Sequence, residues 1–407
     1  MVVTRPVRQC RADFFFLLDN RMRPIFIDFS AVPCGVTNEA LEHIFKAIHD
    51  HGGGIWSPHE SVLIRRLVEL FTQRGLDRLD HVKKAILDWE SGVLHKPAEV
   101  IPAKPGMMVR WNADELSLVK LYLESLPPAQ WTLSDHMMSV EYVVQRYMPL
   151  EELTTEAEWM ATRAGLMGKV QANMAGTATA GQADAILAAL PSTVAAATEA
   201  FTMSAIEKNT LAYGNERAAE NVRSLTDAVR HKMRSVVMQH VQEKTLTGDT
   251  SGRSLEGKLL DEFATLNRDW RRIAVTEAGE CQLQGFIASC KPFSKVKRVE
   301  QYGDACGFCK KIHGRIAEVV PADHPNKDGK TQIWPGKNNV GRSASPRKRV
   351  GNELIARNED ELWWLPAGLS HPHCRGRWVP VLDAEPGDDP SFAQWLQDLL
   401  GGDGVAE

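Results

Sequence analysis

The apolar positions in the first hundred residues follow the spacing of amphipathic helices. Across Leu41–Ile48 they recur at i, i+3, i+4 and i+7, which places them on one helix face. A second helix is expected to begin at residues 57–60, where serine, proline and glutamate stand at the positions of a capping box. Gly75 is expected to end this helix, and a third helix is expected over Leu79–Gly92. These patterns predict a small helical unit over residues 1–96.

The central part of the chain is also helical in pattern. After the proline-containing linker Leu94–Gly106, residues 107–245 carry further helical stripes, and the Ala/Thr/Gly-rich stretch Ala172–Ala183 is expected to be a flexible connector. A long charged helix of this region, expected in a bundle, has a stripe of Val222, Leu225, Val229, Val236 and His240. A polar break at Thr245–Arg253 precedes another periodic helix, with apolar residues Leu259, Phe263, Leu266, Trp270 and Ile273.

Short apolar pieces replace the helical stripes beyond Val296. Val296–Val299 and Ile316–Val320 predict strands, so the expected fold is a mainly α-helical N-terminal region followed by a smaller α+β domain over residues 254–382. Residues 383–407 form an acidic tail with seven acids and no Lys or Arg. A short amphipathic helix capped by Ser391 is expected in this tail, either docking on another protein or packing back on its own domain.

Composition and charge narrow the class of protein. Lys plus Arg is 48 and Asp plus Glu is 52, and the net charge of −4 argues against a surface devoted entirely to nucleic acid. Positive charge is local instead, because residues 323–350 hold seven Lys or Arg and two Asp, a net of +5. Seven cysteines are too few for a disulfide scaffold and favour a reducing, intracellular compartment. The long apolar stretch Ala172–Met203 contains Asp184, Pro191 and Glu199, so we expect a soluble protein without a membrane span.

A cysteine pair and a distant His/Cys pair carry the candidate chemistry. Cys306 and Cys309 form a C-x2-C motif, and His371 and Cys374 follow after 61 intervening residues as H-x2-C. Three thiolates and one imidazole are the usual composition of a closed, structural zinc site. These four residues are therefore predicted to bind a structural zinc ion, which contributes on the order of 10 kcal/mol to folding.

Other interpretations of the same residues remain open. His373 or His313 could take the place of His371 as the fourth ligand. Cys306 and Cys309 could form a redox pair, but the strand–CxxC–helix setting of a βαβ unit is missing from the sequence. A catalytic zinc would require an open coordination position and a general base nearby, and neither is indicated.

The order of motifs around these ligands resembles that of the phage head morphogenesis domain, the Mu F-like minor head protein family. Ile273-Ala274-Val275-Thr276-Glu277 matches the family's IA-x-TE helix, and the C-x2-C, Gly314 and His371-Pro372-x-Cys374-Arg375 follow in the family's order. The resemblance covers about 110 residues, from Leu266 to Leu382. Gly376 replaces the family's second cysteine, His313 stands where Asp is usual, and the interval between the two ligand pairs is long.

The resemblance implies a minor head protein of the virion that acts near the portal in head morphogenesis and accompanies DNA during packaging or ejection. The implied partners are the portal and other phage head proteins, and assembly would take place in the host cytoplasm. The basic segment Lys327–Arg349 would contact DNA or a partner, since Lys and Arg neutralise phosphates and release counterions. Trp334 is its single aromatic residue, so base stacking is not supported, and a solvated loop without a partner is the alternative.

No catalysis is expected on this interpretation. The enzymatic alternative is a zinc-stapled endonuclease of the HNH type, in which His371 and His373 with Asn338 or Asn339 would act on DNA. It is weakened because His371 is already assigned to zinc and because the first half of the HNH motif is missing. Glu277 is expected to form an ion pair or a packing contact rather than to act as a catalytic carboxylate.

Overall fold

A computed structural model describes residues 61–108, 110–174, 176–247, 254–300, 302, 305–381 and 389–401, together with two short strands nearer the N-terminus. The chain divides into two compact units, Met1–Ser57 and Pro58–Glu407. In the first unit β1 (Leu17–Leu18) pairs antiparallel with β2 (Pro24–Ile25). The stripe expected over Leu41–Ile48 and the capping box expected at 57–60 lie outside the described residues.

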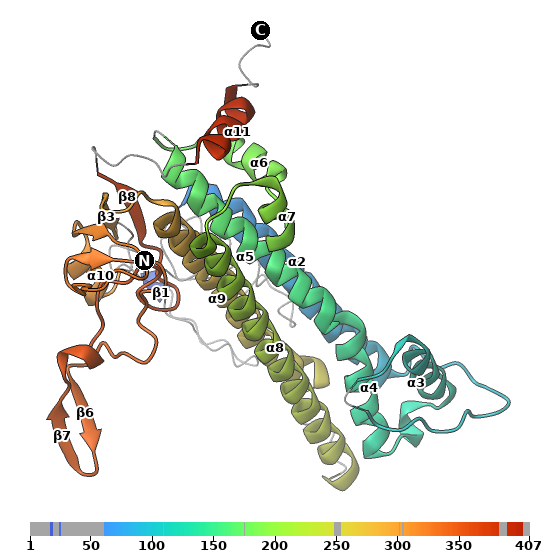
Figure 1. The fold of residues 1–407 in the computed structure, drawn as a ribbon. Coiled ribbons are helices and arrows are strands. Elements are labelled where there is room, and N and C mark those ends of the chain that lie inside the picture. Colours follow the sequence, from blue (N-terminus) through green and yellow to red (C-terminus); the bar gives the residue numbers. More distant parts are fainter. Residues whose placement is uncertain are drawn as a thin grey trace. The chain divides into compact units, whose positions relative to one another are not determined.

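Four long helices form the main body of the second unit (Figure 1). They are α2 (Val62–Ser91), α5 (Leu150–Asn173), α8 (Ala205–Gln242) and α9 (Leu255–Ser289), and α9 contacts each of the other three. Their apolar stripes meet around Trp270, which stacks on Phe71 with ring centroids 5.1 Å apart and donates a hydrogen bond from Nε1 to the Phe71 carbonyl oxygen at 3.0 Å. The expected apolar stripes on α8 and α9 are confirmed in this core, where Val222, Val229, Leu259, Phe263 and Leu266 are buried.

The prediction that Gly75 ends a helix is wrong. A single helix, α2, runs through Gly75 to Ser91 and ends at Gly92, whose φ of +79° is the left-handed conformation of a C-cap. Gly75 is needed for packing instead, because a Cβ built there would lie 1.7 Å from the Trp270 ring. Although the sequence assigned α2 to a unit over residues 1–96, the helix packs with α5 and α9.

Shorter helices connect and cover the long ones. They are α3 (Ala113–Ser125), α4 (Leu133–Tyr147), α6 (Ala180–Ala189) and α7 (Val194–Ala200), with single helical turns η2 (Pro128–Gln130) and η3 (Glu243–Thr247). Capping boxes at Asn112, Thr132, Thr179 and Ser204 satisfy backbone N–H groups at four helix starts. Helices α5 and α6 take in both ends of the expected connector Ala172–Ala183, which leaves only its middle part without helical structure. No helix in the described part of the chain is both long and apolar enough to cross a membrane.

A four-stranded sheet follows α9, as the sequence predicted for a smaller C-terminal region. Its order is β5 (Gln332–Ile333), β4 (Ile316–Val319), β3 (Lys295–Val299) and β8 (Arg377–Pro380); β3 is antiparallel to both neighbours, and β4 is parallel to β5. The strands expected near Val296 and Ile316 are confirmed. One face of the sheet packs with the end of α9 in a second apolar cluster that includes Phe286, Val296 and Trp378. A separate pair, β6 (Arg347–Val350) and β7 (Glu353–Ala356), and the turn η4 (Glu359–Glu361) lie between β5 and β8 in the chain.

The last described helix, α11 (Pro390–Gly401), packs back on its own chain. Phe392 is fully buried and meets Phe201 edge to face with ring centroids 4.9 Å apart. Asp389, rather than the expected Ser391, caps the helix by accepting a hydrogen bond from the Phe392 backbone N–H at 3.1 Å. Of the two alternatives expected for this helix, docking on another protein or packing back, the structure shows that its apolar face packs back on the chain itself. Apart from Asp389 and Asp398, the acidic residues of the tail lie outside the described residues; they stand at positions 383, 385, 388, 403 and 407.

Candidate metal centre

Two cysteines of the candidate site stand at the start of the short helix α10 (Gly307–Ile312). Cys306 is the N-cap residue with extended backbone, and the backbone N–H of Cys309 donates to its Sγ at 3.5 Å. This is N-cap geometry in which a sulfur replaces the usual side-chain oxygen. The first turn of the helix therefore holds the two thiols close enough for a single group to reach both.

His371 is that group, and it comes from the segment that precedes β8. Its Nε2 lies 3.3 Å from Cys306 Sγ and 3.3 Å from Cys309 Sγ. Its Nδ1 lies 2.8 Å from the Pro372 carbonyl oxygen. A hydrogen bond from Nδ1–H to a carbonyl fixes the tautomer in which Nε2 is available to a metal ion. The imidazole also stacks on Trp363, with centroids 5.5 Å apart, which holds the orientation of the ring.

Cys374 and Glu300 extend the cluster on the other side of Cys309. Cys374 Sγ lies 3.8 Å from Cys309 Sγ, and 3.8 Å and 3.7 Å from the two carboxylate oxygens of Glu300. The ligand atoms form two overlapping groups, one of Cys306, Cys309 and His371 and one of Glu300, Cys309 and Cys374, each within 4.8 Å. Cys309 belongs to both groups. This Cys/His/Glu cluster could hold a metal ion.

A buried arginine balances the negative charge of the cluster. Arg298 is 0% exposed; its Nε donates to Glu300 at 2.8 Å, and a terminal nitrogen lies 3.7 Å from Cys374 Sγ. Its other terminal nitrogen donates to the Gly368 carbonyl oxygen at 3.0 Å. Buried charges are stable only when they are paired and hydrogen-bonded, and Arg298 meets both conditions. The cluster therefore has a compensating cation built into β3.

The surroundings favour the thiolate at two of the three cysteines. The hydrogen bond with Cys309 has the largest effect on Cys374. Together with the charge of Arg298 it outweighs the effect of burial and lowers the pKa of Cys374 well below its usual value. The same hydrogen bond and burial raise the pKa of Cys309. Burial opposes ionisation of Cys306, but the backbone N–H of Cys309 and the nearby His371 outweigh it and lower the Cys306 pKa. Thiolates are the form of cysteine that binds metals.

Three separations between donor atoms are close to those around a tetrahedral ion with sulfur and nitrogen ligands, but the donor atoms of Cys306, Cys309, His371 and Cys374 do not all lie within 4.8 Å of one another. Typical zinc bond lengths place two sulfurs about 3.8 Å apart and a sulfur and a nitrogen about 3.5 Å apart. The Cys309–Cys374 separation is 3.8 Å, and both His371–cysteine separations are 3.3 Å. Thiolates and imidazole are soft ligands, whereas magnesium and calcium prefer oxygen.

The two other histidines considered as ligands have different surroundings. His313 Nδ1 accepts a hydrogen bond from the Glu300 backbone N–H at 3.0 Å. His373 takes a left-handed backbone conformation, φ +63°, and its backbone N–H donates to Thr276 Oγ1 at 3.1 Å. Neither belongs to a group of three or more clustered ligand atoms among the described residues.

Helix α9 holds the segment that carries His371 and Cys374. Thr276 accepts the hydrogen bond from His373, and the Glu280 carboxylate accepts one from the Leu369 backbone N–H. Glu277, one turn away, is buried and receives hydrogen bonds from Arg217 at 2.6 Å and Asn221 at 3.0 Å on α8. The expectation that Glu277 forms an ion pair is confirmed. The helix motif and the H-P-x-C motif therefore meet in space.

Several cations of the basic segment Lys327–Arg349 are engaged within the chain. Lys337 is 1% exposed, donates to the carbonyl oxygens of Gly329 and Gln332, and lies 4.7 Å from the ring centroids of both Trp334 and Trp364. Burial lowers the pKa of Lys337 to about 7. Arg342 stacks over Trp364 at 3.7 Å, a contact hidden in the sequence because Trp364 lies outside the segment. The segment is thus partly a folded structural element.

Asn338 and Asn339, the residues considered for nuclease roles, also make local contacts. Asn338 Nδ2 donates to the Gly336 carbonyl oxygen at 3.0 Å. Asn339 Nδ2 donates to the carbonyl oxygens of Trp364 at 3.3 Å and Ser370 at 3.1 Å. These amides stabilise the folded loop that leads to His371.

Sequence reasoning missed Arg298 and Glu300. The signal was the parity of β3, since residues two apart in a strand share a face and Val296 is an inward position. Arg298 and Glu300 continue that parity and are buried with it. Gly376 belongs to the same arrangement, because a Cβ at this position would lie 2.1 Å from a Glu300 carboxylate oxygen. The absence of a side chain at Gly376 therefore makes room for Glu300.

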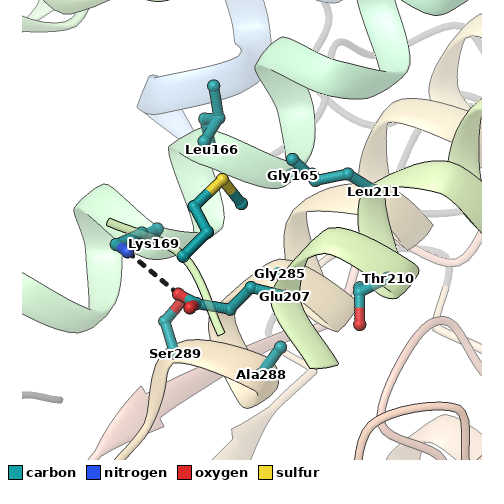
Figure 2. A pocket seen from close by; sticks show the side chains of 10 residues that line it. Gly165, Leu166, Lys169, Glu207, Thr210, Leu211, Gly285, Ala288 and Ser289 are labelled. Carbon is teal, nitrogen blue, oxygen red and sulfur yellow. Dashed lines mark hydrogen bonds and ion pairs between the residues drawn. The ribbon is translucent and has the colours of Figure 1, made fainter. Parts of the chain in front are cut away.

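A small hollow away from the cluster lies between α5, α8 and the end of α9 (Figure 2). Figure 2 shows Lys169 pointing to Glu207, and their charged atoms are 3.0 Å apart. The hollow measures about 200 Å³ including its open mouth, below the roughly 300 Å³ at which small-molecule pockets begin. Lys169 is also paired with Asp389 at 2.7 Å, which ties α5 to the start of α11.

Comparisons with models of protein families, with curated proteins and with solved structures found no match to this chain.

Proposed function

We propose that this chain is a minor phage head protein of the Mu F-like kind, acting in head morphogenesis near the portal. The main support is that the motifs of the resemblance, which are far apart in sequence, contact one another. Thr276 of the helix motif binds the backbone of His373 in the H-P-x-C motif, and Cys306 and Cys309 of the C-x2-C lie beside His371. A chance collection of short motifs would have no reason to share one site.

In this proposal Cys306, Cys309, His371 and Cys374 bind a structural zinc ion. The ion would supply a closed tetrahedral cross-link between α10 and the segment before β8. Three thiolates around a divalent ion leave one negative charge, and the buried guanidinium of Arg298, which contacts both Cys374 and Glu300, compensates part of the negative charge at the site. Function would then depend on the surfaces that the cross-link stabilises, with the portal and other head proteins as partners and the DNA as a further contact.

The head-protein proposal predicts that the chain is a component of the particle. Quantitative mass spectrometry of purified particles of the phage that encodes it should find the chain in a small number of copies relative to the major capsid protein. Empty heads and DNA-filled heads should both contain it, since a morphogenesis protein enters before packaging. Its absence from both kinds of particle would refute the proposal.

The metal assignment predicts one zinc ion per chain. Elemental mass spectrometry on protein purified without added metal should find this ratio, and a plasmid incubated with the same protein and magnesium should stay intact. Zinc below a tenth of an equivalent would contradict the structural site. Magnesium-dependent nicking that is lost in His373→Ala would support the HNH-type nuclease and contradict a purely structural role.

A further inference from the structure

The two-stranded ribbon β6–β7 stands apart from the other strands of the C-terminal region (Figure 1). Its register pairs Arg347 with Ala356 and Arg349 with Leu354 on one face, and Lys348 with Ile355 and Val350 with Glu353 on the other. All four residues of β7 and three of the four residues of β6 are exposed. An isolated two-stranded hairpin gains little stability by itself. Exposed segments held by a rigid scaffold often carry binding functions, so this ribbon is a candidate contact surface.

The two ribbon faces differ in how their cations are used. On one face Lys348 pairs with Glu361, and this contact anchors the ribbon to η4. On the other face Arg347 and Arg349 are both exposed, and neither forms an ion pair with another residue in the described part of the chain. Residues two apart in a strand are about 7 Å apart. The second face therefore presents two aligned guanidinium groups to solvent.

The other cations of the basic segment Lys327–Arg349 make contacts within the chain, which leaves those of the ribbon. Lys337 is enclosed by two tryptophans, Arg342 is stacked on Trp364, and Lys330 pairs with Glu359 at 2.8 Å. Lys327 donates a hydrogen bond to the Ala322 carbonyl oxygen and lies 5.0 Å from the centroid of the Trp334 ring. The cations that remain available on this segment are chiefly the two arginines of the ribbon. Arginine is well suited to phosphate because its planar group donates several hydrogen bonds at once.

We infer that the β6–β7 ribbon binds double-stranded DNA, with Arg347 and Arg349 on the phosphate backbone. The major groove is about 12 Å wide and admits a two-stranded β-ribbon. Strands lie about 4.8 Å apart, so a ribbon with its side chains fits this width. The charge of the arginine face is complementary to the phosphates that line the groove. This inference rests on the proposed function in taking DNA as a partner, and it assigns the contact to one element and one face.

A salt titration of DNA binding by the full chain tests the assignment. Binding to a duplex of mixed sequence is measured at several salt concentrations for the natural chain and for the double variant Arg347→Ala/Arg349→Ala. Each phosphate contact contributes about 0.9 to the slope of log K against log salt, so the double variant should lower that slope by about 2. The affinity at low salt should fall at least tenfold.

The matched control removes the same charge from a different surface. Lys295 and Lys297 are exposed on β3, and neither forms an ion pair with another described residue. The double variant Lys295→Ala/Lys297→Ala should keep the slope of the natural chain within about 0.5. Equal losses in the two double variants would show general charge attraction and would overturn the assignment to the ribbon.

Two further outcomes separate this inference from the proposed function. Should the arginine variant keep the natural slope while the natural chain binds DNA, the ribbon assignment is wrong and the DNA contact itself survives. Absence of DNA binding by the natural chain would refute the ribbon assignment and the DNA contact. The presence of the protein in phage particles would still be tested separately.

Leu354→Ser, a change on the same ribbon face, should leave the salt slope unchanged. If only this variant reduces incorporation into particles, the ribbon docks on protein instead.

Discussion

Replacing Cys309 by serine is expected to release the metal and to unfold the sheet-containing C-terminal region. Cys309 is completely buried and belongs to both groups of ligand atoms, so its loss leaves neither group complete. Structural zinc contributes on the order of 10 kcal/mol to folding, more than most domains have in reserve. The variant should contain less than a tenth of an equivalent of zinc and lose the thermal transition of the C-terminal region.

Cys290→Ser is the matched control for this prediction. Cys290 is a partly buried free thiol outside the cluster, directly after α9. We expect this variant to keep its metal and to unfold at nearly the natural temperature. Full zinc content and an unchanged melting profile in Cys309→Ser would show that the cluster does not hold the structural ion.

Substituting Gly168 by alanine is expected to destabilise the helical body by about 3 kcal/mol or more. Helices α5 and α9 approach each other closely at this residue, where an added Cβ would lie 2.1 Å from the Gln282 carbonyl oxygen and 2.4 Å from the Phe286 backbone nitrogen. Gly285 makes the reciprocal contact, with its Cβ position 2.1 Å from the Gly165 carbonyl oxygen. Backbone atoms on both sides cannot move aside, so the helices must separate.

The sign of this effect makes it informative. Alanine normally stabilises a helix relative to glycine by about 1 kcal/mol. Gly181→Ala in α6 is the control, because an added Cβ there meets nothing within 4 Å. It should raise the free energy of unfolding in urea slightly, whereas Gly168→Ala should lower it strongly. A Gly168→Ala chain as stable as the natural one would show that α5 and α9 are not packed this closely.

In the described part of the chain, the sequence predicted the presence of helices and strands better than the residues at which they begin and end. Apolar spacing found the stripes of α8 and α9 and the strands β3 and β4, because period is a local property. Gly75 was misread as a helix end because its reason is nonlocal: it accommodates the ring of Trp270, far away in the sequence. The same limit applies to α11, whose stripe was visible but whose partner, Phe201, was not.

The residues of the candidate site also fall into those that the sequence predicted and those that it missed. Cys306, Cys309, His371 and Cys374 were predicted from their chemistry and spacing. The structure groups the first three and places Cys374 in a second group with Cys309 and Glu300. Arg298 and Glu300 were missed because charged residues in a strand suggest solvent unless the parity with Val296 is followed. The use of Lys337 and Arg342 inside the fold was missed as well, because it depends on Trp364, which joins the segment only through tertiary contacts.

The two ends of the β6–β7 ribbon lie next to each other, so the length of the ribbon can change without altering the rest of the fold. The backbone N–H of Arg357 donates to the Pro346 carbonyl oxygen at 2.9 Å, so the chain leaves and re-enters the domain at one point. Lengthening a loop whose ends are already fixed costs little, about 0.6 kcal/mol for each doubling of its length. An insertion at this point should therefore leave the sheet intact, and a peptide tag inserted between Gly351 and Asn352 would report on the ribbon without disturbing the ligand cluster.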